Sequence, residues 1–429
     1  MSAEAIKNRG WTVTFSGTGI NLALGILYTW SIFKGAISAS IAKGGPGAFH
    51  WDPKSLNDPY AVCCLVFAFA MILAGRIQDK FGPRVTACIG GVLVGIGFIW
   101  ISQTTSYGIW LIGFGVLAGC GIGFGYSAAT PPALKWFPPE RTGLIAGLVV
   151  SGFGLASVYI APLGTYLVGI WGLQSAMLFF GIAFLVVVCG LSMMLVNPPP
   201  GFSPVKAAPQ QGTGPAKAAP AKKDVRPSEV LKTLDFYILW IIYVIGAGAG
   251  LMVISSVAGM AQKSMGAMAF IAVAILAIGN AAGRIIAGVL SDRIGRSATL
   301  IIMLLFQALL MFIAIPVVGA EKASGFLVVV IATFMGFNYG TNLSLFPSYA
   351  KDLWGLKNFG VNYGLLFSAW GVGGFILSRV SQMLLTNTGR YTSSFLTAAI
   401  LLIIGACLTI WVKGRMAKKT AVPAPALAQ

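Results

Sequence analysis

Apolar stretches of about 20 residues recur along the whole chain, and they constrain its fold more than any other feature. Such a stretch crosses a bilayer as an α-helix, because a helix satisfies its own backbone hydrogen bonds where water is absent. Only 9% of the residues are charged, against about 25% in soluble proteins. The expected transmembrane helices are 11–38, 60–78, 85–103, 107–131, 143–168, 174–196, 236–259, 268–290, 298–318, 325–346, 361–385 and 392–413. The sequence therefore predicts an all-α membrane protein with twelve transmembrane helices.

The positive charges follow a topology rather than a nucleic-acid patch. With the N-terminus placed in the cytoplasm, 21 of the 29 Lys and Arg residues fall in cytoplasmic segments, five fall outside and three lie within apolar stretches. Cytoplasmic loops of membrane proteins carry such an excess. We therefore expect a multi-pass protein of the cell membrane, plasma or inner, with both termini cytoplasmic. Because the distribution of Lys and Arg accounts for the net charge of +18, that charge does not indicate a nucleic-acid partner.

A proline-rich segment divides the chain into two equal sets of spans. Residues 197–232 hold eight of the 21 prolines and cannot build a core. We expect an N-terminal six-helix bundle in residues 1–196 and a cytoplasmic linker rich in Pro, Ala and Lys in 197–235. A C-terminal six-helix bundle follows in 236–413, and residues 414–429 form a disordered cytoplasmic tail.

The two halves are related by an internal repeat with a constant offset. GRIQDKFG at Gly75 matches GVLSDRIG at Gly288, and the same offset carries Gly123 to Gly336 and Tyr126 to Tyr339. Two separated matches in one register predict two parallel six-helix repeats. Secondary transporters use this architecture, with the substrate site near the midplane between the repeats.

The repeated motif has a physical interpretation as a conformational latch. Its glycine would allow two helices to approach closely, and its carboxylate would be held by a neighbouring helix N-terminus or a basic side chain. The alternative is a plain polar loop. The predicted latch residues are Gly75, Asp79, Arg84, Gly288, Asp292 and Arg296. The motif resembles the loop 2–3 and loop 8–9 motif of the major facilitator superfamily, and the resemblance covers all twelve spans.

Arg284 is the candidate substrate anchor, because it lies deep in an apolar stretch without an acidic partner. It precedes Asp292 at the cytoplasmic edge by eight residues, which places it about 12 Å deeper. The half-thickness of the hydrocarbon core is about 15 Å, and a central arginine costs roughly 2.5 to 3.5 kcal/mol on insertion scales. All eleven acidic residues fall in tails, loops or helix ends. A structural ion pair is thus disfavoured, and we expect the counter-ion to be a substrate carboxylate, which a guanidinium binds in a bidentate pair.

Further candidates for the site surround this arginine in the expected fold. Asn280 lies one turn before Arg284 and would bind a substrate hydroxyl or keto group, orient the guanidinium, or pack between helices. Tyrosines suit a cavity wall, although a single tyrosine is more often part of the core or of an interface. The remaining candidates are Tyr28, Tyr126, Asn338, Tyr339 and Asn342, with Phe367, Ser368 and Trp370 as weaker wall residues.

Two basic residues near the outer ends of their helices complete the set. Lys34 either extends to the interface or attracts anions into an outer vestibule, and Arg379 is expected to anchor its helix at the outer surface. The six cysteines all lie in apolar spans and have no metal-ligand spacing, so we expect neither a metal site nor a cofactor.

GILYTWSIF, GCGIGFGY and RTGLIAGLVVSGFGLASVYIAPL resemble two groups of this superfamily, the monocarboxylate transporters and the oxalate/formate antiporters. The first group pairs an acid with the helix 8 arginine and moves its substrate with a proton; here Asn280 replaces the acid. The second group adds a helix 11 lysine for a dianion; here Trp370 takes that place. One central cation favours a small monoanion.

The sequence therefore predicts a secondary active transporter of small monocarboxylates such as lactate or pyruvate, working by alternating access. Proton symport is implied by the resemblance, with the proton carried on the substrate, through Lys34 or through tyrosine-linked water. The alternatives are an organic-anion exchanger of the oxalate/formate type and a transporter-like sensor. No nucleophile–base pair or phosphate loop indicates an enzyme.

Overall fold

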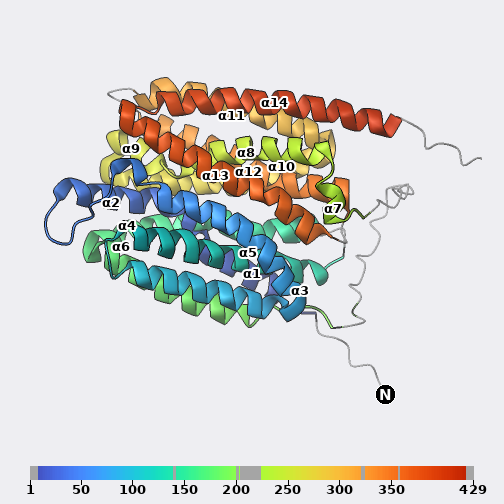
Figure 1. The fold of residues 1–429 in the computed structure, drawn as a ribbon, viewed down its shortest axis with the longest axis horizontal. Coiled ribbons are helices and arrows are strands. Elements are labelled where there is room, and N and C mark those ends of the chain that lie inside the picture. The colour runs from blue at the N-terminus through green and yellow to red at the C-terminus, as the bar shows by residue number, and fades with distance from the viewer. Residues whose placement is uncertain are drawn as a thin grey trace, which may run out of the picture.

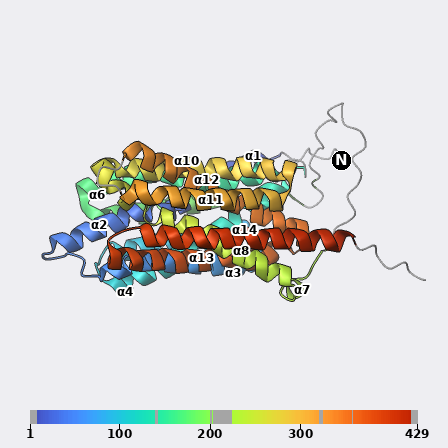
Figure 2. The same cartoon turned by 90° about the horizontal axis from the view of Figure 1, so that it is seen from above.

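A computed structural model describes residues 8–138, 142–199, 202, 224–319, 324–355 and 358–421. All regular elements in these ranges are helices, which run close to parallel or antiparallel along the long axis (Figures 1 and 2). We call residues 8–199 the N-terminal half and residues 224–421 the C-terminal half. In Figure 1 the N-terminal half occupies the lower part of the bundle and the C-terminal half the upper part.

The N-terminal half begins with a first span built from three consecutive helical segments. Its elements are α1 (Gly10–Leu24), the 3-10 turn η1 (Gly25–Thr29), α2 (Trp30–Lys43), η2 (Pro53–Ser55), α3 (Asp58–Ile101), α4 (Tyr107–Trp110), the π-helical η3 (Leu111–Ala118), α5 (Gly119–Lys135) and α6 (Thr142–Ser192).

The C-terminal half begins with a single helical turn and continues with long helices. Its elements are α7 (Pro227–Val230), α8 (Leu234–Ile254), α9 (Val257–Met265), η5 (Gly266–Ala269), α10 (Phe270–Ile294), α11 (Arg296–Gly319), α12 (Gly325–Trp354), α13 (Phe359–Thr388) and α14 (Thr392–Ala421). We call the end of the bundle that carries α7 and the last turns of α14 the near end. The opposite end, with α2, α4 and α9, is the far end (Figure 1).

Glycines with positive φ turn the chain back between antiparallel helices. Gly82 has φ 83° and ψ 170° within α3, and Gly295 has φ 89° and ψ 153° between α10 and α11. Only glycine adopts this conformation without strain. The two positions are equivalent in the sequence repeat, so the repeated motif produces the same turn in both halves. Gly172 turns the chain within α6 in the same way, with φ 76°.

Ten helical stretches in the described residues are long and apolar enough to cross a membrane. Two of them exceed a single crossing, for which about 20 residues suffice: Ile145–Ser192 has 48 residues and Leu234–Ile294 has 61. Gly172 interrupts the first, and η5 interrupts the second. The all-helical membrane fold is confirmed, whereas the count of twelve spans and the domain boundaries remain predictions.

A seam of glycines brings α10 and α12 into direct backbone contact. A Cβ atom at Gly283 would lie 1.9 Å from the carbonyl oxygen of Phe337, and one at Gly340 would lie 2.0 Å from that of Asn280. Gly279 and Gly336 make equivalent approaches one turn away. Small residues allow such packing between membrane helices. The seam fixes the register of α10, which carries Asn280 and Arg284.

The last residues of the expected linker pack against the near end. The backbone N–H of Val225 donates to the carbonyl of Trp354, and the Val225 carbonyl accepts from the side chains of Asn358 and Asn362. Val230, in α7, is fully buried. Most of the linker, including 203–223, and the tail 422–429 lie outside the described residues.

Candidate functional site

Arg284 extends from α10 across the interface between the two halves and contacts α6. Its side chain is 4% exposed. The guanidinium Nε donates to Oδ1 of Asn280 at 3.0 Å, and Nη1 donates to the backbone carbonyl of Val150 at 2.7 Å. Gly154, one turn further along α6, leaves room for the group, since a Cβ there would lie 3.4 Å from the guanidinium carbon. The arginine is thus held by neutral oxygens from both halves.

No carboxylate lies within 4.0 Å of Arg284 among the described side chains, whose ion pairs are Asp292–Arg296, Asp352–Arg296, Asp58–Arg379 and Asp235–Arg415. Nη2 of Arg284 and Nδ2 of Asn280 are buried, and neither makes a hydrogen bond of good geometry in the described part of the chain. The Tyr126 hydroxyl is the neighbour that comes within interaction range of the guanidinium, as a neutral group that leaves its charge unbalanced. A buried donor left unpaired costs about 1 to 3 kcal/mol, and more when it is charged. The site thus presents two donors that fit an anionic acceptor.

A hydrogen-bonded chain of aromatic side chains joins the two halves in the same region. The indole N–H of Trp370 donates to the Tyr339 hydroxyl at 2.8 Å, and that hydroxyl lies 2.5 Å from the hydroxyl of Tyr28. An indole can only donate, so the Tyr339 oxygen accepts from Trp370. Its own proton is then free to be donated to Tyr28. All three side chains are at most 3% exposed.

Aromatic rings from both halves enclose these polar groups. Phe67 lies 5.0 Å from Trp370 and 5.4 Å from Tyr126 between ring centroids. Phe153 lies 4.9 Å from Tyr28, and Phe367 stacks on Trp370 at 5.1 Å. The Arg284 guanidinium lies near the hydroxyls of Tyr28, Tyr126, Tyr339 and Tyr363. We call the set Tyr28, Phe67, Tyr126, Phe153, Tyr339, Phe367 and Trp370 the aromatic cluster.

Phe153 and Phe67 line the site without having been predicted from the sequence. Neither carries a polar group. Within an apolar span, the sequence does not distinguish a phenylalanine that lines a cavity from one that packs in the core. Phe67 is the repeat equivalent of Asn280, which is the one signal that pointed to its position. The ring of Phe153 contacts Tyr28, Phe67 and Tyr126, and only the packing of α6 against η1, α3 and α5 places it there.

Three predicted site residues, Asn338, Asn342 and Ser368, hydrogen-bond within the C-terminal half, away from Arg284 and the aromatic cluster. Asn338 and Asn342 donate through Nδ2 to carbonyls of their own helix, at 3.0 and 3.1 Å, and their Oδ1 atoms are buried without a donor in that part of the chain. The Ser368 hydroxyl accepts from the indole of Trp240 at 2.9 Å and donates to Leu365. Their role in binding remains a prediction.

The two basic residues expected near the outer surface both contact the opposite half. Lys34 is 7% exposed, and its ammonium donates to Ser256 and Gln382 of the C-terminal half. The alternative in which Lys34 extends to the interface is therefore wrong in this conformation, because α9 and α13 cover it. Its vestibule role remains a prediction for a conformation open at the far end. Arg379 is half-exposed and pairs with Asp58.

Comparisons with known proteins give the family. The family model of the Major Facilitator Superfamily matches residues 11–378 and 264–428. The chain belongs to this superfamily. It is a multi-pass membrane transporter of this family and not an enzyme.

Three relatives illustrate the range of this likeness within the superfamily. An uncharacterised MFS-type transporter of Escherichia coli (strain K12), YhjX, is 29% identical over 87% of this chain and 88% of its own. The oxalate:formate antiporter of Oxalobacter formigenes is 25% identical over 97% and 94%. The human monocarboxylate transporter 11 is 25% identical over 94% and 82%. The resemblance to both transporter groups is confirmed.

The superfamily motif at the near end forms a charged cluster within the C-terminal half. Nη1 of Arg296 lies 2.6 Å from Asp292 and also contacts Ser291, while its Nε lies 3.2 Å from Asp352 on α12. Asp352 was not predicted from sequence, because nothing in the motif points to α12. In the N-terminal copy the side chain of Asp79 lies outside the described residues. The latch function stays a prediction for both copies.

One part of the latch interpretation is wrong in this conformation. A Cβ atom at Gly75 or Gly288 would meet nothing within 4 Å, so neither glycine serves a close helix approach. Close approaches occur instead at the seam of Gly279, Gly283, Gly336 and Gly340. The spacing of the motif did not distinguish a glycine facing a helix from one facing open space.

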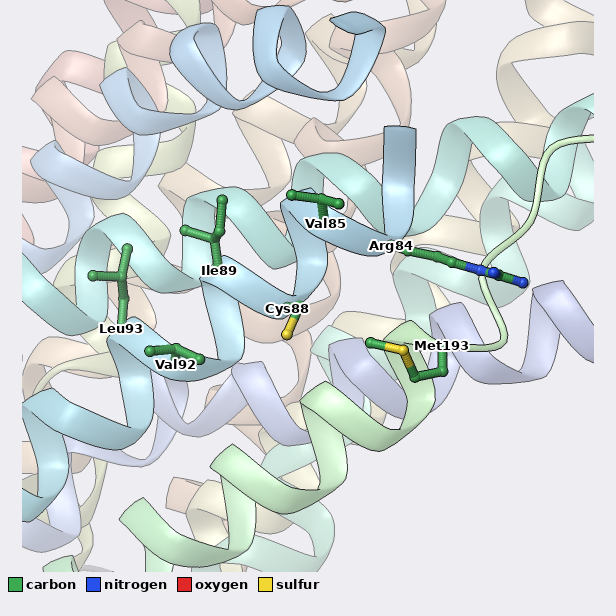
Figure 3. A pocket seen from close by; sticks show the side chains of 7 residues that line it. All are labelled: Arg84, Val85, Cys88, Ile89, Val92, Leu93 and Met193. Atoms are coloured by element: carbon green, nitrogen blue, oxygen red, sulfur yellow. The ribbon is translucent and has the colours of Figure 1, made fainter. Parts of the chain in front are cut away.

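A surface groove of about 470 Å³ lies away from Arg284, on the side of the N-terminal half. Figure 3 shows its lining, with side chains from α3 and Met193 after the end of α6. Arg84 extends beyond the other side chains at one end of the groove (Figure 3). The remaining lining is apolar: Val85, Cys88, Ile89, Val92, Leu93 and Met193. Such a surface suits lipid contact and does not resemble a site for a small anion.

Proposed function

We propose that this transporter carries small monocarboxylates such as lactate or pyruvate by alternating access, with Arg284 as the anchor for the carboxylate. The observation that supports this most directly is the pair of buried donors without a hydrogen bond of good geometry, Nη2 of Arg284 and Nδ2 of Asn280. A carboxylate accepts from both and neutralises the guanidinium. Hydrogen bonds to charged partners are worth about 1.5 to 3 kcal/mol each, which offsets the loss of water around a small anion.

The charge of the site favours a monoanion over a dianion. Arg284 is its one cation among the described side chains, because Lys34 and Arg379 are engaged with Ser256, Gln382 and Asp58. Trp370 contributes an indole donor and no charge. A second carboxylate would enter the aromatic cluster without a counter-ion, and an unpaired buried charge is costly.

In this proposal the two bundles, residues 1–196 and 236–413, rock about the Arg284 region during the transport cycle. The linker 197–235 connects them. The near end and both termini are cytoplasmic in this proposal, and the membrane is the plasma or inner membrane. The basic residues of the sequence support this orientation. The Asp292–Arg296–Asp352 cluster and its N-terminal counterpart at Gly75, Asp79 and Arg84 act at the cytoplasmic side.

Proton symport is the coupling that we propose, with the proton carried on the substrate carboxylate. The described residues offer neither a histidine nor a carboxylate within 4.0 Å of Arg284 to carry it. Exchange of one organic anion for another is the second candidate. It is supported by the similarity to an oxalate:formate antiporter over 97% of this chain.

Uptake of labelled lactate and pyruvate into reconstituted vesicles tests the proposal. Uptake driven by an inward proton gradient without internal anion supports symport, whereas uptake that requires trapped anion supports exchange. Arg284→Ala should abolish both, while Arg390→Ala, a loss of charge in an exposed turn, should transport normally. Normal uptake by Arg284→Ala would overturn the assigned anchor. A correctly folded wild-type protein that moves no small acid would favour the sensor alternative.

A further inference from the structure

The corner that precedes α3 is joined to the C-terminal half by the side chain of Asn57. Its Nδ2 donates to the hydroxyl of Ser255 at 3.3 Å and to the backbone carbonyl of Ser378 at 3.0 Å. Its Oδ1 accepts from the indole of Trp30, which fixes the orientation of the amide. Asn57 is fully buried. One side chain of the N-terminal half therefore holds α13 and the α8–α9 junction together.

The next residue, Asp58, forms an ion pair across the same interface. Its Oδ1 lies 3.1 Å from Nε of Arg379 on α13, an ion pair without hydrogen-bond geometry, and its Oδ2 accepts from the Tyr107 hydroxyl at 2.7 Å. The carboxylate is 6% exposed, whereas the Arg379 side chain is 48% exposed. A buried carboxylate is stable only while it is paired. Asp58 consequently favours the conformation in which α13 is close.

Lys34 adds a third connection. Its ammonium donates to Oγ of Ser256 at 3.1 Å and to Oε1 of Gln382 at 3.3 Å, both in the C-terminal half. The amide of Gln382 in turn donates to the carbonyl of Pro53 at 3.0 Å. Within the described part of the chain, the acceptors of the ammonium are neutral oxygens. Separation of the halves here exposes the cation to water, which solvates it, so these contacts can be broken in each cycle.

Backbone packing closes the same end. A Cβ at Gly371 of α13 would lie 2.8 Å from the carbonyl oxygen of Cys64, and one at Gly374 would lie 3.0 Å from the Cβ of Cys64. Further toward the near end, the closest approach at Gly364 is 3.4 Å, to Ile72. The polar contacts between the halves in the described residues lie at the far end or at Arg284 and the aromatic cluster.

We propose that Lys34, Asn57 and Asp58 form a gate that seals the far end of the transport path. The gate closes on Ser255, Ser256, Ser378, Arg379 and Gln382 and opens in each cycle. These three are positioning residues: they set the population of the closed state and do not touch substrate. The inference rests on the proposed alternating access and is independent of which anion is carried.

The charge balance of the gate predicts which variants open it. Asp58→Asn keeps an acceptor for Tyr107 but removes the attraction for Arg379, so the closed state loses population. Arg379→Gln leaves the buried carboxylate unpaired, which favours opening further because water can then reach it. The double variant should show less than the sum of the two single effects, since both remove the same ion pair.

Labelling of the Ser378→Cys variant, in a background whose six natural cysteines are replaced, measures opening. Ser378 is fully buried at the gate and contributes its backbone carbonyl, which the substitution retains. A membrane-impermeant maleimide, applied to the purified protein in nanodiscs, reaches both faces and requires no knowledge of orientation. We expect Asp58→Asn, Asn57→Ala and Arg379→Gln each to raise the labelling rate by roughly two- to tenfold, the range for a partly exposed ion pair or a buried hydrogen bond.

The control is Asp235→Asn, which breaks the ion pair with Arg415 between α8 and α14 at the near end. Its labelling rate should match that of the parent. Unchanged labelling in Asp58→Asn and Asn57→Ala, with monodisperse folded protein, would overturn the gate. A general increase that includes Asp235→Asn would also overturn it, because the effect would then be loosened packing. The assay requires no carboxylate, so failure of the monocarboxylate proposal leaves this result interpretable.

Discussion

Among the described residues, two buried cations lie between the halves, and their surroundings differ in one respect. Lys34 at the far end has partners for its ammonium in Ser256 and Gln382. Arg284 has two nitrogens engaged by Asn280 and Val150, whereas Nη2 is buried and makes no hydrogen bond of good geometry among the described residues. The far end thus uses polar groups to hold the halves together. The Arg284 region instead retains a donor that is available to a bound ligand.

This difference separates closure from binding along one interface. A contact made only between protein groups contributes to the stability of one conformation. A buried donor without a partner destabilises a closed conformation that lacks a ligand, and binding relieves that cost. Substitutions at the two regions should therefore change different measurements: conformational populations at the far end, and substrate affinity at Arg284.

The largest expected effect comes from placing an acid beside Arg284. In Asn280→Asp the carboxylate would replace an amide oxygen that lies 3.0 Å from Nε and would neutralise the guanidinium. We expect lactate or pyruvate affinity at neutral pH to fall about 10- to 100-fold, the equivalent of one or two charge-assisted hydrogen bonds. Acid pH should restore affinity, because protonation of the new carboxyl group frees Arg284.

Calorimetric titration of the purified protein across pH measures this effect. Asn280→Leu, similar in size and uncharged, is the matched control and should show a smaller loss with no recovery at acid pH. An Asn280→Asp protein that binds as tightly as the parent at neutral pH would contradict the anionic acceptor. Loss without recovery at any pH would indicate that the substitution distorts the site rather than neutralising it.

Much of the Arg284 region is predictable from sequence because charge is rare in apolar spans. The depth of Arg284 and its lack of an acid follow from residue positions alone, and the repeat marks Tyr126 and Tyr339 together. The repeat also predicts equivalent structure at Gly82 and Gly295, and both glycines make the same turn. These features are local or periodic, so a single sequence contains them.

The far end was harder to predict because its pairs join distant parts of the chain. Asp58 reads as a helix start and Arg379 as a surface anchor, and no pattern in the sequence connects them. Lys34 lies where a lysine can extend to the interface, and only the packing of α9 and α13 buries it. The same applies to Phe153, whose position in the aromatic cluster depends on the packing of α6 against η1, α3 and α5.

An intermediate effect is expected from the glycine seam that supports Arg284. In Gly283→Ala the new Cβ would lie 1.9 Å from a backbone carbonyl oxygen, which cannot move aside as a side chain can. Overpacking of this kind costs about 1 to 3 kcal/mol, so the thermal midpoint in detergent should fall by several degrees. Gly288→Ala on the same helix meets nothing within 4 Å and should not lower it.

Fluorescence-detected thermal unfolding with and without substrate separates two consequences of this variant. A displaced α10 should also reduce stabilisation by lactate, because Arg284 lies one residue after Gly283. Equal midpoints for the two alanine variants would show that α10 and α12 are less closely packed than the seam requires. A lower midpoint with unchanged ligand stabilisation would show that the seam supports the bundle but not the site.

The smallest expected effect is the loss of the hydroxyl that connects Trp370 with Tyr28. Tyr339→Phe removes the acceptor for the indole and the group 2.5 Å from the Tyr28 hydroxyl while keeping the ring in place. A neutral hydrogen bond contributes about 0.5 to 1.5 kcal/mol, so substrate affinity should fall two- to tenfold. Tyr349→Phe is the matched control: its hydroxyl bonds Ser297 outside the aromatic cluster, and affinity should not change.

The gate measurement at Ser378 should be unaltered in both variants if binding and closure are separate properties. Faster labelling in Tyr339→Phe would instead show that the Tyr28–Tyr339 contact, which also joins the two halves, contributes to closure, and the distinction between the two regions would have to be redrawn.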